Sequence, residues 1–410
     1  MRFAAGLSDA VNVRTAAERA CREVLDRLEG APCHAAFVFA STAYRTAWPA
    51  VAADICDRLR PRVLIGCSGS GIIGGDQELE WVPALSIVGA HLPDVRLFPF
   101  SVSPEELEQS SAGGFWIDKI GVAPDAKPVF VTCVDPFTCD PNKLLQELNA
   151  TYRSRPIVGG LVSGGTQPGD HFLFMDAEVS QKGAVGLAMA GNIAMDTVVS
   201  QGCRPVGRPY VVTKADEHII WELAGRQAVD VLHEVLTVMT PEDRELAQRG
   251  SIFVGLVINE MRSAFSPGDF LIRNIVGLDP QAGALGISGD AQVGQTLQFH
   301  LRDAGTSREE LRRVLAARQS SAETPALAGA LFFNCSGRGR SLYGTPHHDI
   351  QTIRAVAGQL PLGGFFCNGE IGPVGGTNFL HGYTASLGLF HPLARPAQPP
   401  QPANTASRTA

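Results

Sequence analysis

A unit of apolar strand, helix, second strand and glycine-rich turn occurs three times along the 410-residue chain. The first strands of the three copies start at residues 35, 128 and 329, and the glycine turns begin near residues 66, 159 and 363. Such internal repetition constrains the fold strongly, because each copy is one supersecondary unit. The sequence therefore predicts an α/β protein built from duplicated strand-helix-strand-turn-strand units.

A different pattern fills the interval between the second and third copies. Residues 216–239 predict one long helix from their apolar stripe, and residues 307–319 predict another that begins at an N-capping serine. The segments between these helices are apolar and predict strands over residues 251–260, 269–279, 283–288 and 295–303.

Two prolines and two arginines in CRPVGRPY, residues 203–210, mark the predicted boundary between two lobes. We expect mixed, antiparallel-rich sheets flanked by helices, layered as helix, sheet, sheet and helix, because the strands are apolar on both faces. The sequence predicts an N-terminal helix over residues 1–32, followed by a first domain over residues 33–205 and a second domain over residues 206–390. A disordered Pro/Ala-rich tail is predicted over residues 391–410.

Charge and cysteine content argue against several classes of protein. The net charge is −7 and there is no basic stripe with interleaved aromatic residues, so we expect no nucleic-acid partner. The N-terminus lacks a signal-peptide pattern, and no apolar run of about eighteen residues offers a membrane span. Nine cysteines without C-x-x-C spacing fit reduced thiols better than a disulfide framework. The sequence therefore predicts a cytoplasmic protein.

The stretch LIGCSGSGIIGG, residues 64–75, contains the letters G-x-G-x-x-G of a dinucleotide loop. That chemistry needs a helix directly after the glycines, so that the helix N-terminus can meet the pyrophosphate. Acidic residues and a strand follow here instead. The same stretch offers Ser68 and Ser70, but no histidine motif precedes them and the G-x-S-x-G elbow is absent. We predict neither a cofactor nor a catalytic serine.

Metal-ligating patterns are equally weak. His347, His348 and Asp349 are consecutive at a predicted helix start, where neighbouring histidines point apart and the acid complements the helix dipole. Cys133 and Cys139 lack the spacing of a zinc knuckle. We predict no metal site.

Polar residues follow the apolar strand of the third copy in the sequence NCSGRG, residues 334–339. Side chains at the carboxyl end of a strand lie where α/β sheets place ligand crevices. Arg338 could hold a carboxylate through its bidentate fork, and Cys335 beside that cation could have a lowered pKa. The alternative is a plain glycine turn in which Arg338 pairs with Glu370 or Asp303.

The turn NGEIGP, residues 368–373, is the partner turn of the same unit. A single acid without a histidine or acidic partner makes a poor catalytic pair, but it can clamp an ammonium group. We therefore expect a zwitterionic ligand whose carboxylate lies on Arg338 or Arg302 and whose amine lies on Glu370 or Asp303. The predicted ligand-binding residues are Asn334, Cys335, Arg338, Asn368, Gly369, Glu370, Arg302, Asp303, Ser68 and Ser70.

In the order of these motifs the chain resembles FIST domain proteins, with FIST-N followed by FIST-C. The resemblance rests on LIGCSGSGIIGG with EWVPALSI, RPIVGGLVSGG with GAVGLAMAG, IVGLDPQAGALGISGDAQVGQTLQFHLRD, and LFFNCSGRG with GGFFCNGEIGPVGG. It implies an intracellular sensory module for a small ligand such as an amino acid or a related carboxylate. No kinase, cyclase, chemoreceptor or F-box pattern is found, so we expect a stand-alone form that signals through a separate protein partner.

Two other functions stay open on the residues. One is a protein-interaction scaffold without a small ligand. The other is an enzyme that uses Cys335 as a nucleophile, which requires a reactive thiolate. We expect the non-enzymatic sensor.

Overall fold

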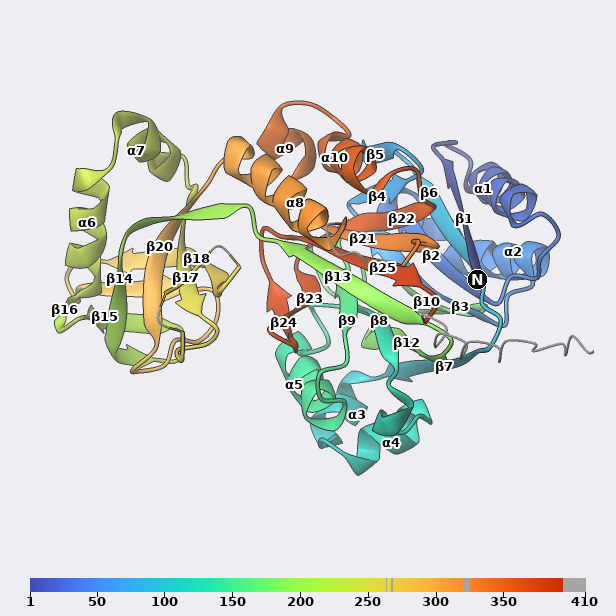
Figure 1. Ribbon diagram of the computed structural model, residues 1–410, viewed down its shortest axis with the longest axis horizontal. Helices are drawn as coiled ribbons and strands as arrows, with labels where there is room; N and C mark the ends of the chain where they lie inside the picture. The colour runs from blue at the N-terminus through green and yellow to red at the C-terminus, as the bar shows by residue number, and fades with distance from the viewer. Residues whose placement is uncertain (263, 267, 320–324, 394–410) are drawn as a thin grey trace, which may run out of the picture.

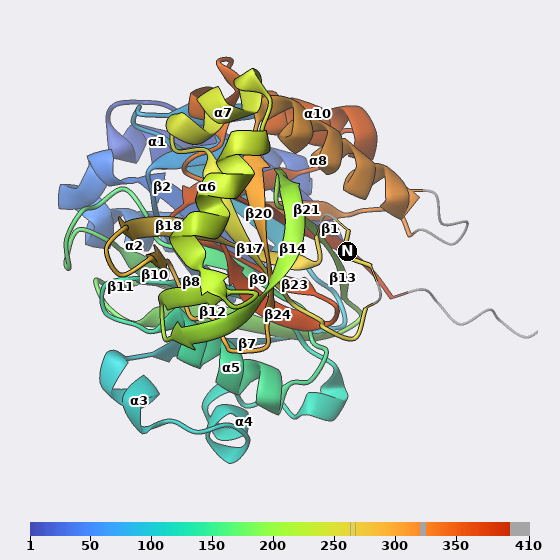
Figure 2. The ribbon, with the colours of Figure 1, turned by 90° about the vertical axis from the view of Figure 1, so that its left-hand side faces the viewer.

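The computed structural model describes residues 1–262, 264–266, 268–319 and 325–393. Apart from residues 391–393, the tail expected to be disordered lies outside the described residues. Figures 1 and 2 show a large body and a smaller inserted domain that projects from one side of it.

Three six-stranded sheets, counted over the described residues, form the body, and each follows the same strand order. The first contains β1 (Arg2–Ser8), β6 (Leu85–His91), β2 (Ala35–Ser41), β3 (Val63–Gly69), β10 (Leu173–Met175) and β11 (Glu178–Ser180). The second contains β7 (Val95–Val102), β12 (Ala184–Gly191), β8 (Val129–Val134), β9 (Ile157–Leu161), β23 (Glu370–Val374) and β24 (Thr377–His381). The third contains β13 (Ala194–Ser200), β25 (Ala385–His391), β21 (Gly329–Cys335), β22 (Leu362–Cys367), β4 (Gly71–Gly74) and β5 (Gln77–Glu80).

The three copies are interlocked by an exchange of hairpins. Hairpin β4–β5 of the first copy extends the third sheet, β23–β24 of the third extends the second, and β10–β11 of the second extends the first. Each sheet keeps one parallel pair at its centre, namely β2–β3, β8–β9 and β21–β22. The body therefore has threefold pseudosymmetry. The G-x-G-x-x-G letters lead into hairpin β4–β5 and not into a helix.

One glycine in each parallel pair makes this packing possible. Each faces the carbonyl oxygen of its partner on the neighbouring strand, so closely that a Cβ would overlap that oxygen. The separations would be 1.9 Å for Gly66 and Val38, 1.8 Å for Gly159 and Thr132, and 1.7 Å for Gly364 and Phe332. The repeated glycines of the sequence are thus equivalent positions of one unit.

The inner faces of the three sheets share a single apolar core, in which Phe39 packs against Phe365 and Phe333 with ring centroids 5.4 and 6.1 Å apart. Helices cover the outer faces on three sides of the body (Figure 1). They are α1 (Val13–Leu28) and α2 (Trp48–Leu59) on the first sheet, α3 (Pro104–Gln109), α4 (Gly114–Ile120) and α5 (Pro141–Thr151) on the second, and α8 (Ala304–Gln319) and α10 (His348–Ala357) on the third. The predicted α/β class, with mixed, antiparallel-rich sheets flanked by helices, is confirmed.

The inserted domain separates β13 from α8. Its strands are β14 (Cys203–Asp216), β15 (Ile219–Leu223), β16 (Arg226–Gln227), β17 (Ile252–Val257), β18 (Phe270–Asp279), β19 (Ala284–Ile287) and β20 (Thr296–Arg302), and its helices are α6 (Ala228–Val238) and α7 (Pro241–Gln248). Because β14 pairs with both β20 and β15, the sheet closes on itself. The predicted boundary segment 203–210 is the first half of β14.

The single long helix predicted over residues 216–239 is wrong. Its first part is β15, whose Ile220 and Leu223 are fully buried in the domain core. Ala224 and Gly225 then have φ angles of 51° and 74°, which is the backbone of a tight two-residue hairpin turn. Only from Ala228 does the apolar spacing belong to a helix.

Candidate functional site

Polar residues meet where the parallel strand pairs end. Ser70 follows β3 and Ser336 follows β21, and their Oγ atoms are 3.1 Å apart. The Ser70 backbone N–H donates to Ser163 Oγ at 2.9 Å, and Ser336 Oγ lies 3.5 Å from Asn368 Oδ1. We call Ser70, Ser163, Ser336 and Asn368 the axial seam. It lies at the carboxyl ends of the strands, where open sheets bind ligands.

A cavity of about 410 Å³ opens beside this seam, between the body and the inserted domain. We call it the interdomain cavity. Its lining comes from α5 and the turns around β23 and β24 of the body, and from β18 and the loop after β19 of the inserted domain. These residues are Asn142, Ile272, Arg273, Asn274, Ser288, Gly289, Asn368, Gly369, Leu380, His381, Gly382 and Tyr383.

Arg273 is the cationic residue of this lining. It is half-buried, and its Nη1 donates to the carbonyl oxygens of Ile272 and Leu380, each at 3.2 Å. Burial lowers its pKa, but a guanidinium stays charged in proteins. Among the described residues, no carboxylate forms an ion pair with Arg273, and none of the cavity-lining residues is acidic. The charge of nearby Asp290 favours the charged form of Arg273 without an ion pair, so the cavity contains a positive charge whose remaining donors are left for an anion.

His381 supplies a hydrogen-bond acceptor in the same lining as the Arg273 donors. It is buried, and its Nε2 lies 2.9 Å from the carbonyl oxygen of Gly372, which requires a proton on Nε2. Burial lowers its pKa to about 4, with a further contribution from the charge of Arg273. The ring is therefore neutral at pH 7 and Nδ1 is an acceptor, and in the described residues Nδ1 has no hydrogen-bond partner.

Tyr383 separates the cavity from a polar network in the interior. Its hydroxyl donates to Asn274 Oδ1, and the Arg302 guanidinium lies 4.8 Å from its ring centroid. Its φ of 63° is in the left-handed region, which is unusual for a bulky residue and costs about 1–3 kcal/mol. The fold thus holds this ring in place against a local backbone preference.

The interior network centres on a fully buried ion pair. Arg338 Nε and Nη2 donate to Asp349 Oδ2 and Oδ1 at 2.8 and 3.0 Å, and the Tyr343 hydroxyl donates to Oδ1 at 2.8 Å. Asn334 Nδ2 adds a bond of 3.1 Å to Oδ2. Burial alone would raise the pKa of Asp349, but the charge and hydrogen bonds of Arg338 hold it below its usual value. The expected carboxylate-binding role of Arg338 does not fit this geometry, and its partner is neither Glu370 nor Asp303.

The expected roles of Glu370 and Cys335 also conflict with their surroundings. Burial raises the pKa of Glu370 to about 8, although Thr384 N–H donates to its Oε2 at 3.0 Å. It is therefore mostly protonated at pH 7 and cannot clamp an ammonium by charge. Burial, followed by the nearby Glu370 carboxyl, raises the pKa of Cys335 to about 12. The lowered pKa expected for this thiol is wrong, because desolvation outweighs the nearby cations.

The remaining predicted residues divide between the seam, the network and other parts of the body. Asn368 and Gly369 line the cavity, and Ser70 lies on the seam. Arg302 is buried behind Tyr383 and donates to Gly337 O at 2.5 Å. Ser68 is fully buried and accepts from Phe172 N–H at 3.0 Å, and Asp303 accepts from Arg204 Nε at 3.1 Å and from Thr306 N–H at the start of α8.

Sequence reasoning missed Arg273, Asn274, His381 and Tyr383. Arg273 could have been identified from the sequence, because it is the charged residue inside the apolar stretch FLIRNIVGL. His381 and Tyr383 carried no such signal, since they reach the cavity only through the hairpin exchange that places β24 beside the second sheet.

The described residues contain no group of three or more His, Cys, Asp or Glu side chains placed to hold a metal ion. His347 Nδ1 accepts from Glu78 N–H at 2.9 Å, whereas the His348 ring stacks on Tyr343 with centroids 3.6 Å apart. In the same part of the chain, no helix is long and apolar enough to cross a membrane.

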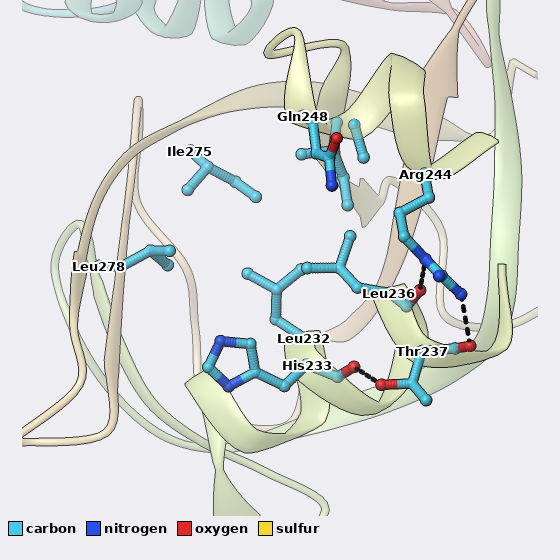
Figure 3. Close-up of a pocket in the computed structure, with 10 residues that line it drawn as sticks. Leu232, His233, Leu236, Thr237, Arg244, Gln248, Ile275 and Leu278 are labelled. Atoms are coloured by element: carbon cyan, nitrogen blue, oxygen red, sulfur yellow. Dashed lines mark hydrogen bonds between the residues drawn. The ribbon is translucent and has the colours of Figure 1, made fainter. Parts of the chain in front are cut away.

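An apolar hollow of about 590 Å³ lies on the inserted domain, between α6, α7 and β18 (Figure 3). Leu232, Leu236, Ile275 and Leu278 form much of its wall. Its arginine, Arg244, donates to the carbonyl oxygens of Leu236 and Thr237 at 3.2 and 2.9 Å and so caps the end of α6.

Comparisons with known proteins cover most of the chain. Family models described as FIST N domain and FIST C domain match residues 34–226 and 228–373. An uncharacterized protein of Mycobacterium tuberculosis strain H37Rv, Rv0628c, is 38% identical over 395 residues, which is 95% of this chain and 100% of the relative. An uncharacterized protein of Mycobacterium bovis, Mb0898c, is 36% identical over 395 residues, with 95% and 99% of the two chains covered.

Proposed function

The chain belongs to the FIST family, and from that premise we propose that it is a cytoplasmic sensory module that binds a small carboxylate in the interdomain cavity. The observation that carries the proposal is Arg273, a half-buried cation without an ion-pair partner among the described residues, in a cavity without acidic lining. A cavity of about 410 Å³ lies within the range of about 300–1,000 Å³ typical of small-molecule sites.

His381 narrows the class of ligand. Its buried Nδ1 acceptor and the Arg273 guanidinium belong to the same lining, so a ligand that carries a donor close to its carboxylate satisfies both. α-Amino acids and α-hydroxy acids have this arrangement. Asn274, Ser288 and Asn368 add neutral hydrogen-bonding groups that suit the polar remainder of such a molecule.

A ligand in this cavity contacts both the body and the inserted domain. The ligand would therefore favour the arrangement of body and inserted domain that it binds most tightly. The size of this effect is set by the difference in its affinity for that arrangement and for the other arrangements. In the proposed mechanism this shift is read by a separate signalling protein.

The proposal is tested by a thermal-shift screen with amino acids, lactate, glycolate, succinate and acetate. Binding at about 100 times the dissociation constant adds about 2.7 kcal/mol of stability, which is a shift of several degrees. We expect α-amino or α-hydroxy acids to raise Tm in the wild type and in Arg249→Gln, a control on an exposed arginine, and to raise it clearly less in Arg273→Gln. A screen without any stabilising carboxylate contradicts the proposal.

A protein-interaction scaffold is the second candidate, and the apolar hollow of Figure 3 favours it. Leu278 on its wall is 48% exposed, and the nearby residues Val276 and Val238 are 63% and 74% exposed. Exposed apolar surface of this kind commonly marks a partner site. Co-purification of a discrete protein with the wild type but not with Leu278→Glu, unaffected by carboxylates, supports this function over the sensor.

The buried Cys335 thiol, with its pKa of about 12, argues against an enzyme that uses Cys335 as a nucleophile.

A further inference from the structure

A second cleft, of about 510 Å³, has Ser70 of the axial seam in its lining. Ser41, Thr42, Arg45, Ser70, Trp81 and Gly164 line it, and it shares no lining residue with the interdomain cavity. We propose that this cleft binds a planar heteroaromatic ring that carries an anionic substituent. Trp81 stacks on the ring, Arg45 binds the anion, and the turns around Ser70 and Gly164 bind the polar ring edge.

Trp81 is the first observation behind this site. Its side chain is 70% exposed, and in the described residues it has neither a ring contact nor a hydrogen bond. Its φ of 59° is a genuine outlier for a bulky residue, and such strain concentrates at functional sites. The Trp81 indole lies at the mouth of the cleft on a strained backbone and does not pack in the core. It offers a flat apolar face on which a ring can stack.

The floor of the cleft is the second observation. Gly164 has a φ of 95°, and a Cβ there would lie 2.8 Å from Thr42 Cγ2. Only glycine fits, and its small size leaves the backbone of this turn open to the cleft. Thr42 Oγ1 donates to Gly164 O at 3.2 Å and keeps its two acceptor sites, and Ser41 Oγ accepts from Ala43 N–H at 3.1 Å and keeps its donor and one acceptor site.

The charge of the cleft is the third observation. Arg45 is exposed on the rim, and over the described part of the chain it forms no ion pair. The lining contains no carboxylate. The nearby Asp170 interacts with Arg45 through its charge but forms no ion pair with it, so the fork of the guanidinium is left for a carboxylate or a phosphate.

Fluorescence and calorimetry test the site with AMP, GMP, UMP and nicotinate as probes. The first three carry a phosphate and the fourth a carboxylate, so the series includes both kinds of anion. We expect at least one probe to quench the emission of the wild type, and Trp81→Ala to weaken its binding by about tenfold or more, measured by calorimetry. Arg45→Gln should weaken the same probe several-fold and reduce the salt dependence of binding.

Matched variants separate this site from the interdomain cavity. Arg273→Gln should bind the ring probe with unchanged affinity, and Arg60→Gln, at another arginine outside the lining, should do the same. Trp81→Phe keeps a stacking face and should retain most of the affinity. The proposal is overturned if no probe binds the wild type, or if Trp81→Ala binds the probe as tightly as the wild type does.

Discussion

Arg338 and Asp349 form a buried ion pair joined by two hydrogen bonds of 2.8 and 3.0 Å, and both side chains are fully excluded from solvent. Arg338 is one of the two arginines that the sequence predicted to bind a ligand carboxylate, and here its fork is occupied by Asp349. Arg273, which lines the interdomain cavity together with Tyr383, is the cationic residue of that cavity.

Breaking the buried pair should cost a large part of the stability of the body. Arg338→Met leaves the Asp349 carboxylate buried without its cation, so we expect a loss of about 3–5 kcal/mol in the free energy of unfolding. The exposed neighbour Arg340→Met is the control and should change stability by less than about 0.5 kcal/mol. Urea denaturation of the two variants measures both values, and equal stabilities would show that the pair contributes nothing.

Glu370 should make stability fall as the pH rises. Its pKa is raised from 4.5 to about 8 in the folded protein, so between these pH values the unfolded chain loses a proton that the folded chain retains. The contribution is thus fully present below about pH 4.5 and is lost progressively up to about pH 8. Glu370→Gln should remove this slope and gain stability relative to the wild type as the pH is raised. A wild-type slope that survives the substitution would assign the effect to other groups.

Each equivalent glycine of the parallel pairs should be intolerant of a methyl group. Gly66→Ala and Gly364→Ala force a Cβ onto the carbonyl oxygens of Val38 and Phe332, and we expect a cost of about 3 kcal/mol or more at each. Gly114→Ala is the control, because nothing lies within 4 Å of its Cβ position in α4. Thermal unfolding should show a large drop in Tm for the first two and none for the third. Similar behaviour of all three would contradict the close strand packing.

Cys335 should be unreactive in the folded protein. Its pKa of about 12 leaves almost no thiolate at pH 8, so an aromatic disulfide reagent should label it only at the rate at which the structure opens. Comparison of wild type with Cys335→Ser under native and denaturing conditions isolates this thiol. Rapid native labelling that disappears in Cys335→Ser would revive the nucleophile hypothesis.

The fold class and the three copies were predictable, because alternating apolar strands and recurrent glycines are local features of the sequence. The exchange of hairpins was not, since nothing within β4–β5 states that its partner is β22, about 290 residues further along the chain. The same limit explains the site. Asn368 and Gly369 were found from their place after a strand, whereas His381 enters the cavity only through that exchange. Arg338 was predicted to bind a ligand because the sequence alone does not show that Asp349, eleven residues later, forms an ion pair with it.

The most direct test of the interdomain site is calorimetric titration of the stabilising carboxylate into wild type, Arg273→Gln and His381→Phe. We expect Arg273→Gln to lose about 1.5–3 kcal/mol of binding free energy, roughly ten- to a hundredfold in Kd, because a charge-assisted hydrogen bond is removed. His381→Phe should reduce the preference for an α-amino or α-hydroxy acid over the matching plain acid. Unchanged affinity in Arg273→Gln, with the protein folded, would contradict the account.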